Sequence, residues 1–133
     1  MRCLAVVALV SGLIACAGSE APRPRATPVE DTYQLRVQKA QAAWAQQIVM
    51  RVRRAWSMPP GIPPDFACTV RVQLAGDGRV IEASLSRACG SEAIDASVLA
   101  AVWSSSPMPL PTVPEAFDPE LIIHLCPRPG PSC

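Results

Sequence analysis

Hydrophobic residues recur every three or four positions between Asp31 and Trp56, which predicts an amphipathic helix. The apolar stripe consists of Tyr33, Val37, Ala40, Trp44, Ile48, Val52 and Ala55. No proline or glycine interrupts this stretch, and Glu30, Asp31 or Thr32 can cap or favour its start. Pro59-Pro60 ends it, and further prolines fill the loop that follows.

The next pattern predicts a β-hairpin. From Phe66 to Leu74 apolar residues alternate with polar ones, as in a strand with one buried face. Gly76-Asp77-Gly78 then supplies the residues that a tight turn requires. A second strand is predicted from Arg79 to Ser86. Its buried face is expected to contain Ile81, Ala83 and Leu85.

A second helix and a third strand complete the predicted fold. The helix begins at Gly90 or Ser91, ends before Pro107, and has an apolar stripe of Ile94, Val98, Leu99 and Val102. The last strand runs from Glu120 to Cys126. Leu121, Ile123 and Leu125 are expected to point inward, and Ile122 and His124 outward. The order α-β-β-α-β predicts an α+β fold, a small three-stranded antiparallel sheet with helices on one face.

The N-terminus has the features of an export signal. An apolar run from Leu4 to Ile14 follows Met1-Arg2, and it is shorter than the roughly 20 residues of a membrane-spanning helix. Leu13-Ile14-Ala15-Cys16 resembles a bacterial lipobox, which implies lipidation of Cys16 and cleavage before it. The alternative is a plain signal peptide cut near Ala15 or Ala17. By the same resemblance, Ala17 rather than aspartate after Cys16 favours the outer membrane, with the protein facing the periplasm.

The chain therefore divides into four predicted parts: a signal peptide (1–15), a lipidated tether (16–30), a folded domain (31–127) and a short tail (128–133). The tether is rich in small residues and proline, which bury too little apolar area to fold. Twelve extended residues of it reach at most about 40 Å. The domain is therefore expected to stay close to the membrane.

Charge argues against nucleic acid as a partner. The chain has 12 basic and 11 acidic side chains, and removal of residues 1–15 would take away only Arg2, leaving 11 of each sign. A nucleic-acid-binding domain would have a clear basic excess. The cluster Arg51-Arg53-Arg54 is interpreted as a solvated helix face, with contact to anionic lipid headgroups as the alternative.

Cys68, Cys89, Cys126 and Cys133 remain once Cys3 and Cys16 are assigned to the N-terminal segment. In an exported protein, four cysteines indicate a disulfide framework with three possible connectivities.

Catalysis finds little support in these residues. His124 is the only histidine, and on a strand it shares a face with Cys126. A Cys–His pair can form a nucleophile, so a cysteine-dependent envelope hydrolase is kept as a distant alternative. A disulfide-bonded Cys126 suits an oxidising compartment better.

No metal site, cofactor or small-molecule substrate is predicted, because a metal needs three or four converging ligands. The tryptophans Trp44, Trp56 and Trp103 are interpreted as packing residues.

The motifs in order resemble the C-terminal periplasmic domain shared by TonB and TolA. The resemblance spans about residues 33 to 127. It rests on the long helix ending at Trp56, the turn Gly76-Asp77-Gly78-Arg79-Val80, Cys89-Gly90-Ser91, the run Pro107-Met108-Pro109-Leu110-Pro111, and Phe117 before the last strand. It implies a Cys68–Cys89 disulfide of the TolA type, which leaves Cys126 to pair with Cys133. TonB and TolA proteins have an inner-membrane helix that engages a proton-driven motor. The short N-terminal segment here departs from that pattern, so only the binding domain carries over.

The resemblance implies a lipid-anchored protein-binding module in cell-envelope integrity or complex assembly, and not an enzyme. Its expected partners are envelope proteins of the Tol-Pal or TonB type. They would add a strand along the outer edge of the last strand, at Glu120, Leu121, Ile122, Ile123, His124 and Leu125. The alternative is that the proline-rich segments 107–114 and 127–131 cover this edge. A second functional hypothesis is an assembly or pilot lipoprotein of another envelope secretion or transport machine.

The lipobox gives a direct prediction. Cys16→Ser should release the protein into the soluble periplasmic fraction or block its processing, because serine lacks the thiol that carries the lipid. Detergent-phase partitioning of the wild type and the variant measures this. Equal partitioning of both into the detergent phase would contradict lipidation at Cys16.

Overall fold

The computed structural model describes residues 27–126. The predicted signal peptide, Cys16, most of the tether, and the tail with Cys133 lie outside the described residues.

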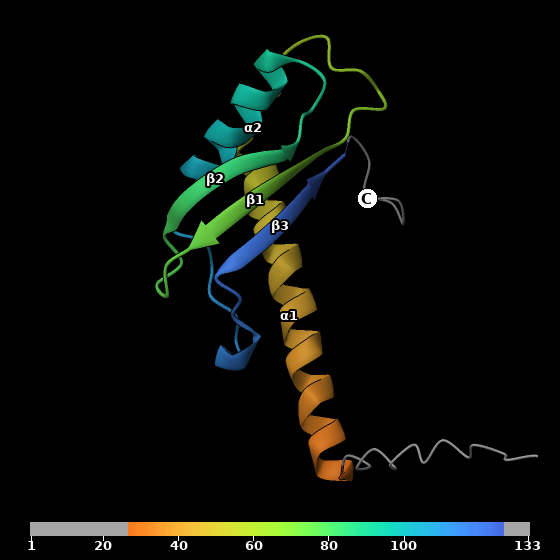
Figure 1. The fold of residues 1–133 in the computed structure, drawn as a ribbon, viewed down its shortest axis with the longest axis vertical. Coiled ribbons are helices and arrows are strands. Elements are labelled where there is room, and N and C mark those ends of the chain that lie inside the picture. The colour runs from red at the N-terminus through yellow and green to blue at the C-terminus, as the bar shows by residue number, and fades with distance from the viewer. Residues whose placement is uncertain (1–26, 127–133) are drawn as a thin grey trace, which may run out of the picture.

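Helix α1 (Pro28–Ala55) is the longest element. Thr27 is its N-cap residue and Pro28 occupies the first turn, where the missing N–H of proline costs no helical hydrogen bond. Its only buried residues, Trp44, Ile48 and Val52, lie in its C-terminal half. That half packs behind the sheet, whereas the N-terminal half extends beyond it (Figure 1).

The sheet contains β1 (Cys68–Leu74), β2 (Val80–Arg87) and β3 (Glu120–Leu125) in the order β2-β1-β3, with both pairings antiparallel. Helix α2 (Glu92–Ser104) follows β2, and the short 3-10 helix η1 (Pro114–Ala116) precedes β3. Both α-helices lie on the same side of the sheet (Figure 1). The α+β class and the order α-β-β-α-β are confirmed; η1 was not predicted.

The core lies between the sheet and the two helices. Its centre is the row of alternate β1 side chains, of which Val70 and Val72 are completely buried. Val52 of α1 and Val98 and Val102 of α2 are equally inaccessible. Burial of each such side chain contributes roughly 1.5–3 kcal/mol. The alternation predicted for β1 is therefore confirmed.

The predicted buried face of β2 is wrong at Ile81. Ile81 was assigned to the face of Ala83 and Leu85, but its side chain is 60% exposed. The register explains this, because Leu74 pairs with Val80 whereas Gln73 pairs with Glu82, so Ile81 is the extra residue of a β-bulge. The bulge shifts the alternation, and Val80 takes the buried position instead.

A disulfide joins Cys68 at the start of β1 to Cys89 in the turn before α2, as the family resemblance implied. Both residues are buried. Next to it, the backbone N–H of Cys89 donates to Asp95 Oδ1 at 2.7 Å, and Ser91 caps the helix by accepting from the N–H of Ile94. With a sequence separation of 21 residues, the bridge is worth roughly 3 kcal/mol through the unfolded state.

Aromatic residues attach α1 to the segment after α2. Trp44 Nε1 donates to the carbonyl oxygen of Pro109 at 2.6 Å, and its ring lies 5.5 Å from that of Phe117. Nearer the start of α1, the pKa of Tyr33 is raised, first by desolvation and then by the Glu115 carboxylate of η1.

Trp103 of α2 departs from the prediction that it is a packing residue. Its side chain is 47% exposed, so it is not a core residue.

The turn between β1 and β2 is constrained at Gly78. This residue has φ +86°, and a Cβ built on it would collide with the carbonyl oxygen of Met108. The carbonyl of Gly78 accepts from the N–H of Met108 at 2.7 Å. Glycine is therefore required here both by its backbone conformation and by the close approach of another backbone segment.

Gly78→Ala should consequently destabilise the protein by at least about 2 kcal/mol, since it adds left-handed strain and disrupts the contact with Met108. Gly76→Ala is the matched control in the same turn, because a Cβ there meets nothing within 4 Å. It should change stability by less than about 0.5 kcal/mol. Urea unfolding followed by tryptophan fluorescence compares the two; equal effects would contradict the role assigned to Gly78.

Candidate functional site

Strand β3 forms one outer edge of the sheet, because it pairs with β1 alone among the described strands (Figure 1). Its register places Ile123 opposite Val70 and Ile122 opposite Arg71. Ile123 and Leu125 are buried, and Leu121 packs partly against the core. Ile122 is 56% exposed on the opposite face. The predicted division between inward and outward side chains is confirmed.

The same register shows where the backbone groups of β3 point. The N–H of Leu74 donates to the carbonyl of Pro119 at 2.8 Å, so the pair Leu74–Pro119 is of the hydrogen-bonded type. Such pairs alternate along an antiparallel ladder. Ile123 thus directs its N–H and C=O toward β1. Ile122 and His124 direct theirs away from β1, toward the open edge.

Both ends of this edge are capped. The N–H of Glu120 donates to Asp118 Oδ1 at 2.9 Å. At the other end, the Arg53 guanidinium donates to the carbonyl oxygen of Cys126 at 3.2 Å. The described residues place no such cap on Ile122 or His124, so the open part of the edge is centred on these two residues. We call this stretch the β3 edge.

The outer face beside the β3 edge has mixed chemistry. His124 Nδ1 lies 3.2 Å from Thr69 Oγ1, and Arg71 lies 3.5 Å from the carboxylate of Glu120. Both contacts join β3 to β1 across exposed positions. They hold the side chains on either side of Ile122 and leave Ile122 as the exposed apolar surface of β3.

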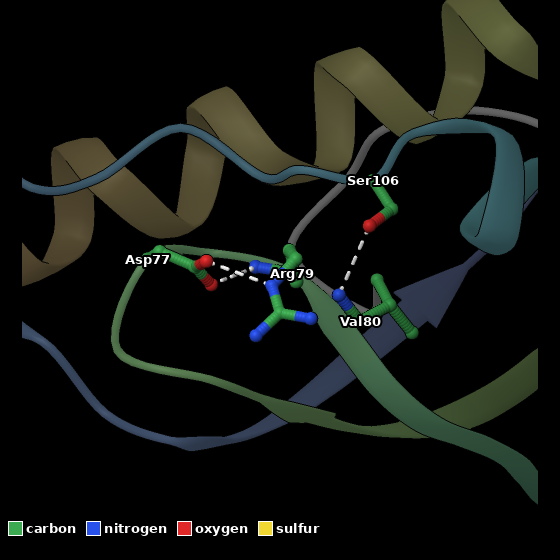
Figure 2. A network of polar contacts seen from close by, with 4 residues as sticks. All are labelled: Asp77, Arg79, Val80 and Ser106. Carbon is green, nitrogen blue, oxygen red and sulfur yellow. Dashed lines mark hydrogen bonds and ion pairs between the residues drawn. The ribbon is translucent and has the colours of Figure 1, made fainter.

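The opposite edge of the sheet, along β2, is covered where it begins. The N–H of Val80 donates to Ser106 Oγ at 3.1 Å, and Met108 donates to Gly78. Figure 2 shows Ser106, from the segment after α2, above the first residues of β2. Arg79 bonds Asp77 through its guanidinium and its N–H, which holds the pKa of Asp77 below its usual range.

The segment after α2 includes residues 107–114, which the sequence analysis considered as an alternative cover of the β3 edge. Among the described residues, this segment bonds the sheet through the N–H of Met108, which donates to the carbonyl of Gly78 in the hairpin, on the side of β2. The other proposed cover, 127–131, lies outside the described residues.

The arginine cluster of α1 is not a uniform solvated face. Arg51 Nε donates to the carbonyl of Ser105 at 2.9 Å, and Arg53 caps Cys126. These two side chains therefore connect α1 to the end of α2 and to the end of β3. Within residues 27–126, Arg54 bonds only the Met50 carbonyl of its own helix, at 3.3 Å.

The Cys–His pair is not arranged as a nucleophile. Cys126 is disulfide-bonded, and a catalytic cysteine must be a thiolate. Because Cys133 lies outside the described residues, the Cys126–Cys133 pairing stays a prediction. Between residues 27 and 126, no group of three or more His, Cys, Asp or Glu residues is arranged to hold a metal ion.

Sequence reasoning identified the strand but missed its caps. A signal for Asp118 was present, since an aspartate readily accepts from the N–H two residues later. Nothing in the local sequence links Arg53 to Cys126, which is 73 residues away.

Comparisons with known proteins agree with the geometry. The profile of a family described as TonB C terminal matches residues 41–125. A solved structure of TolAIII bound to a peptide derived from the N-terminus of TolB is similar to this chain, with 26% identity and a TM-score of 0.55. The match covers 65% of this chain and 74% of that chain. A search of curated proteins found no match.

Proposed function

Because the chain belongs to the TonB C-terminal family and carries a protein-binding domain of the TolA/TonB type, we propose that its partner adds a strand along the β3 edge. The observation that carries this proposal is the outward direction of the backbone groups of Ile122 and His124. An added strand obtains affinity from such groups and specificity from the side chains beside them.

The similar TolAIII structure is bound to a peptide from the N-terminus of TolB. By analogy, the partner is an envelope protein of the Tol-Pal or TonB type that offers an extended segment. The protein then acts in envelope integrity or in the assembly of an envelope complex, through binding and not through catalysis.

The location proposed for this binding is the periplasmic side of the outer membrane. Its support is the apolar run followed by Leu13-Ile14-Ala15-Cys16. In the part of the chain that the structure describes, no helix combines the length and the hydropathy needed to cross a bilayer. A lipid on Cys16 would hold the domain at the membrane through the tether.

Proline variants test the edge. His124→Pro or Ile122→Pro removes an outward N–H but no bond of the β1–β3 ladder, so partner capture should fall about fivefold or more, the equivalent of roughly 1 kcal/mol. The alanine variants should have smaller effects, because they keep the N–H. Capture from crosslinked cell-envelope extracts, compared for one and the same partner band, measures the difference.

Ala83→Pro is the matched control. By the same alternation the N–H of Ala83 points away from β1, but at the outer edge of β2. The Ala83→Pro variant should capture the partner as well as the parent protein does. Far-ultraviolet circular dichroism must show that each variant is folded. A folded His124→Pro protein that captures the partner as well as the parent would rule out the β3 edge.

A further inference from the structure

Helix α1 and the segment after α2 border a cleft that shares no residue with the β3 edge. Its volume is about 460 Å³, and it is lined by Gln47, Arg51, Arg54 and Pro109. The first three residues are spaced four and three positions apart, so their side chains share one face of the helix. Pro109 forms the other wall, and its carbonyl accepts from Trp44 Nε1 at 2.6 Å. We call this feature the α1 cleft.

The two arginines of the α1 cleft are held in place by backbone carbonyls. Arg51 Nε donates to Ser105 at 2.9 Å, and Arg54 Nε donates to Met50 at 3.3 Å. Among residues 27–126, the two guanidinium groups make no other bond, so the terminal nitrogens of both still have N–H donors to offer. A side chain that is already positioned loses less conformational freedom when a ligand arrives.

Neither arginine is neutralised within the described part of the chain. Arg71 and Arg79 each form an ion pair with a carboxylate, whereas Arg51 and Arg54 form none. These two lie one helical turn apart, where like charges destabilise a helix slightly. The α1 cleft therefore concentrates uncompensated positive charge, although the formal net charge of the whole chain is only +1. A bound anion would remove the repulsion.

The set of donors favours a phosphate monoester over a carboxylate. Both guanidinium groups have planar forks of N–H donors, and the amide of Gln47 can donate as well. A carboxylate has two oxygens, which a single guanidinium satisfies in the bidentate arrangement. A phosphate monoester has three acceptor oxygens and a charge close to −2, so it can bond both arginines and the amide together.

We propose that the α1 cleft binds a phosphate monoester group. Arg51 and Arg54 recognise its charge, and Gln47 adds a hydrogen bond. Soluble phosphate monoesters and the headgroup of phosphatidic acid present the same oxygens, so the same donors serve both. Because the α1 cleft shares no residue with the β3 edge, its occupation does not require a partner strand.

Two soluble salts test the chemistry of the site. Glycerol 3-phosphate and acetate are each titrated into the ¹⁵N-labelled full chain at one ionic strength and about pH 7.5, where a phosphate monoester is mostly a dianion. The Nε–H resonances of Arg51 and Arg54 and the side-chain amide of Gln47 report binding. Glycerol 3-phosphate should give saturable shifts at millimolar concentration, and acetate should bind at least about threefold more weakly. Equal affinities would overturn the assignment to phosphate.

Arg54→Gln should weaken the binding of glycerol 3-phosphate about two- to fivefold, because it removes one of the two charges but no contact between elements. Lys39→Gln is the matched control, since it removes the same charge from an exposed position of α1 that does not line the cleft. It should leave the affinity unchanged. Equal weakening by both variants would indicate attraction by overall charge and overturn the site. The dispersion of the amide spectrum shows whether each variant is folded.

Bicelles distinguish a lipid from a soluble ligand. The full chain is placed in phosphatidylcholine bicelles with and without phosphatidic acid, so that its N-terminal segment meets a bilayer in both. Shifts of Arg51 and Arg54 that require phosphatidic acid, and that Arg54→Gln reduces, identify a lipid headgroup. A response to glycerol 3-phosphate without such shifts identifies a soluble monoester. If neither probe shifts these resonances, the α1 cleft is not a phosphate site, and strand addition at the β3 edge is unaffected.

Discussion

The whole domain depends on β1, the central strand, which is hydrogen-bonded to β2 along one side and to β3 along the other. Its even-numbered residues direct their backbone groups to β3 and their side chains into the core, and its odd-numbered residues direct their backbone groups to β2. Its first residue, Cys68, is tied to the start of α2. A sheet of three strands has no other interior strand, so every remaining strand is an edge.

The two outer edges of the sheet, along β2 and β3, differ in which of their backbone groups are covered. The β2 edge is covered at its start by Ser106 and Met108, and it carries register shifts near both ends. Bulges and covering segments are devices that prevent unwanted pairing. Among residues 27–126, the β3 edge is capped only at its ends, by Asp118 and Arg53. The same caps make long edge-to-edge association between molecules difficult and leave a short uncapped stretch between them.

Periodicity was sufficient to predict the two α-helices and the three strands, because the alternation in β1 and the helical stripe of α1 are both uninterrupted. The family resemblance supplied the Cys68–Cys89 pairing and the place of β3 at the edge, and the family is confirmed. The exposure of Ile81 could not be predicted, because Val80 and Ile81 are both apolar and a bulge decides which one is buried. The bond from Arg53 to the carbonyl of Cys126 could not be predicted either, because tertiary packing brings these two residues together.

The size of the open edge has an energetic consequence. Two residue pairs add about four hydrogen bonds, each worth roughly 1 kcal/mol net. Their sum of roughly 4 kcal/mol is comparable to the lower estimates for the cost of association. Backbone pairing alone would therefore give little affinity to the proposed strand addition, so a partner at the β3 edge would need side-chain contacts as well. In the proposed strand addition, the backbone of β3 would provide the docking geometry, and the side chains beside it, among them the exposed Ile122, would provide the specificity.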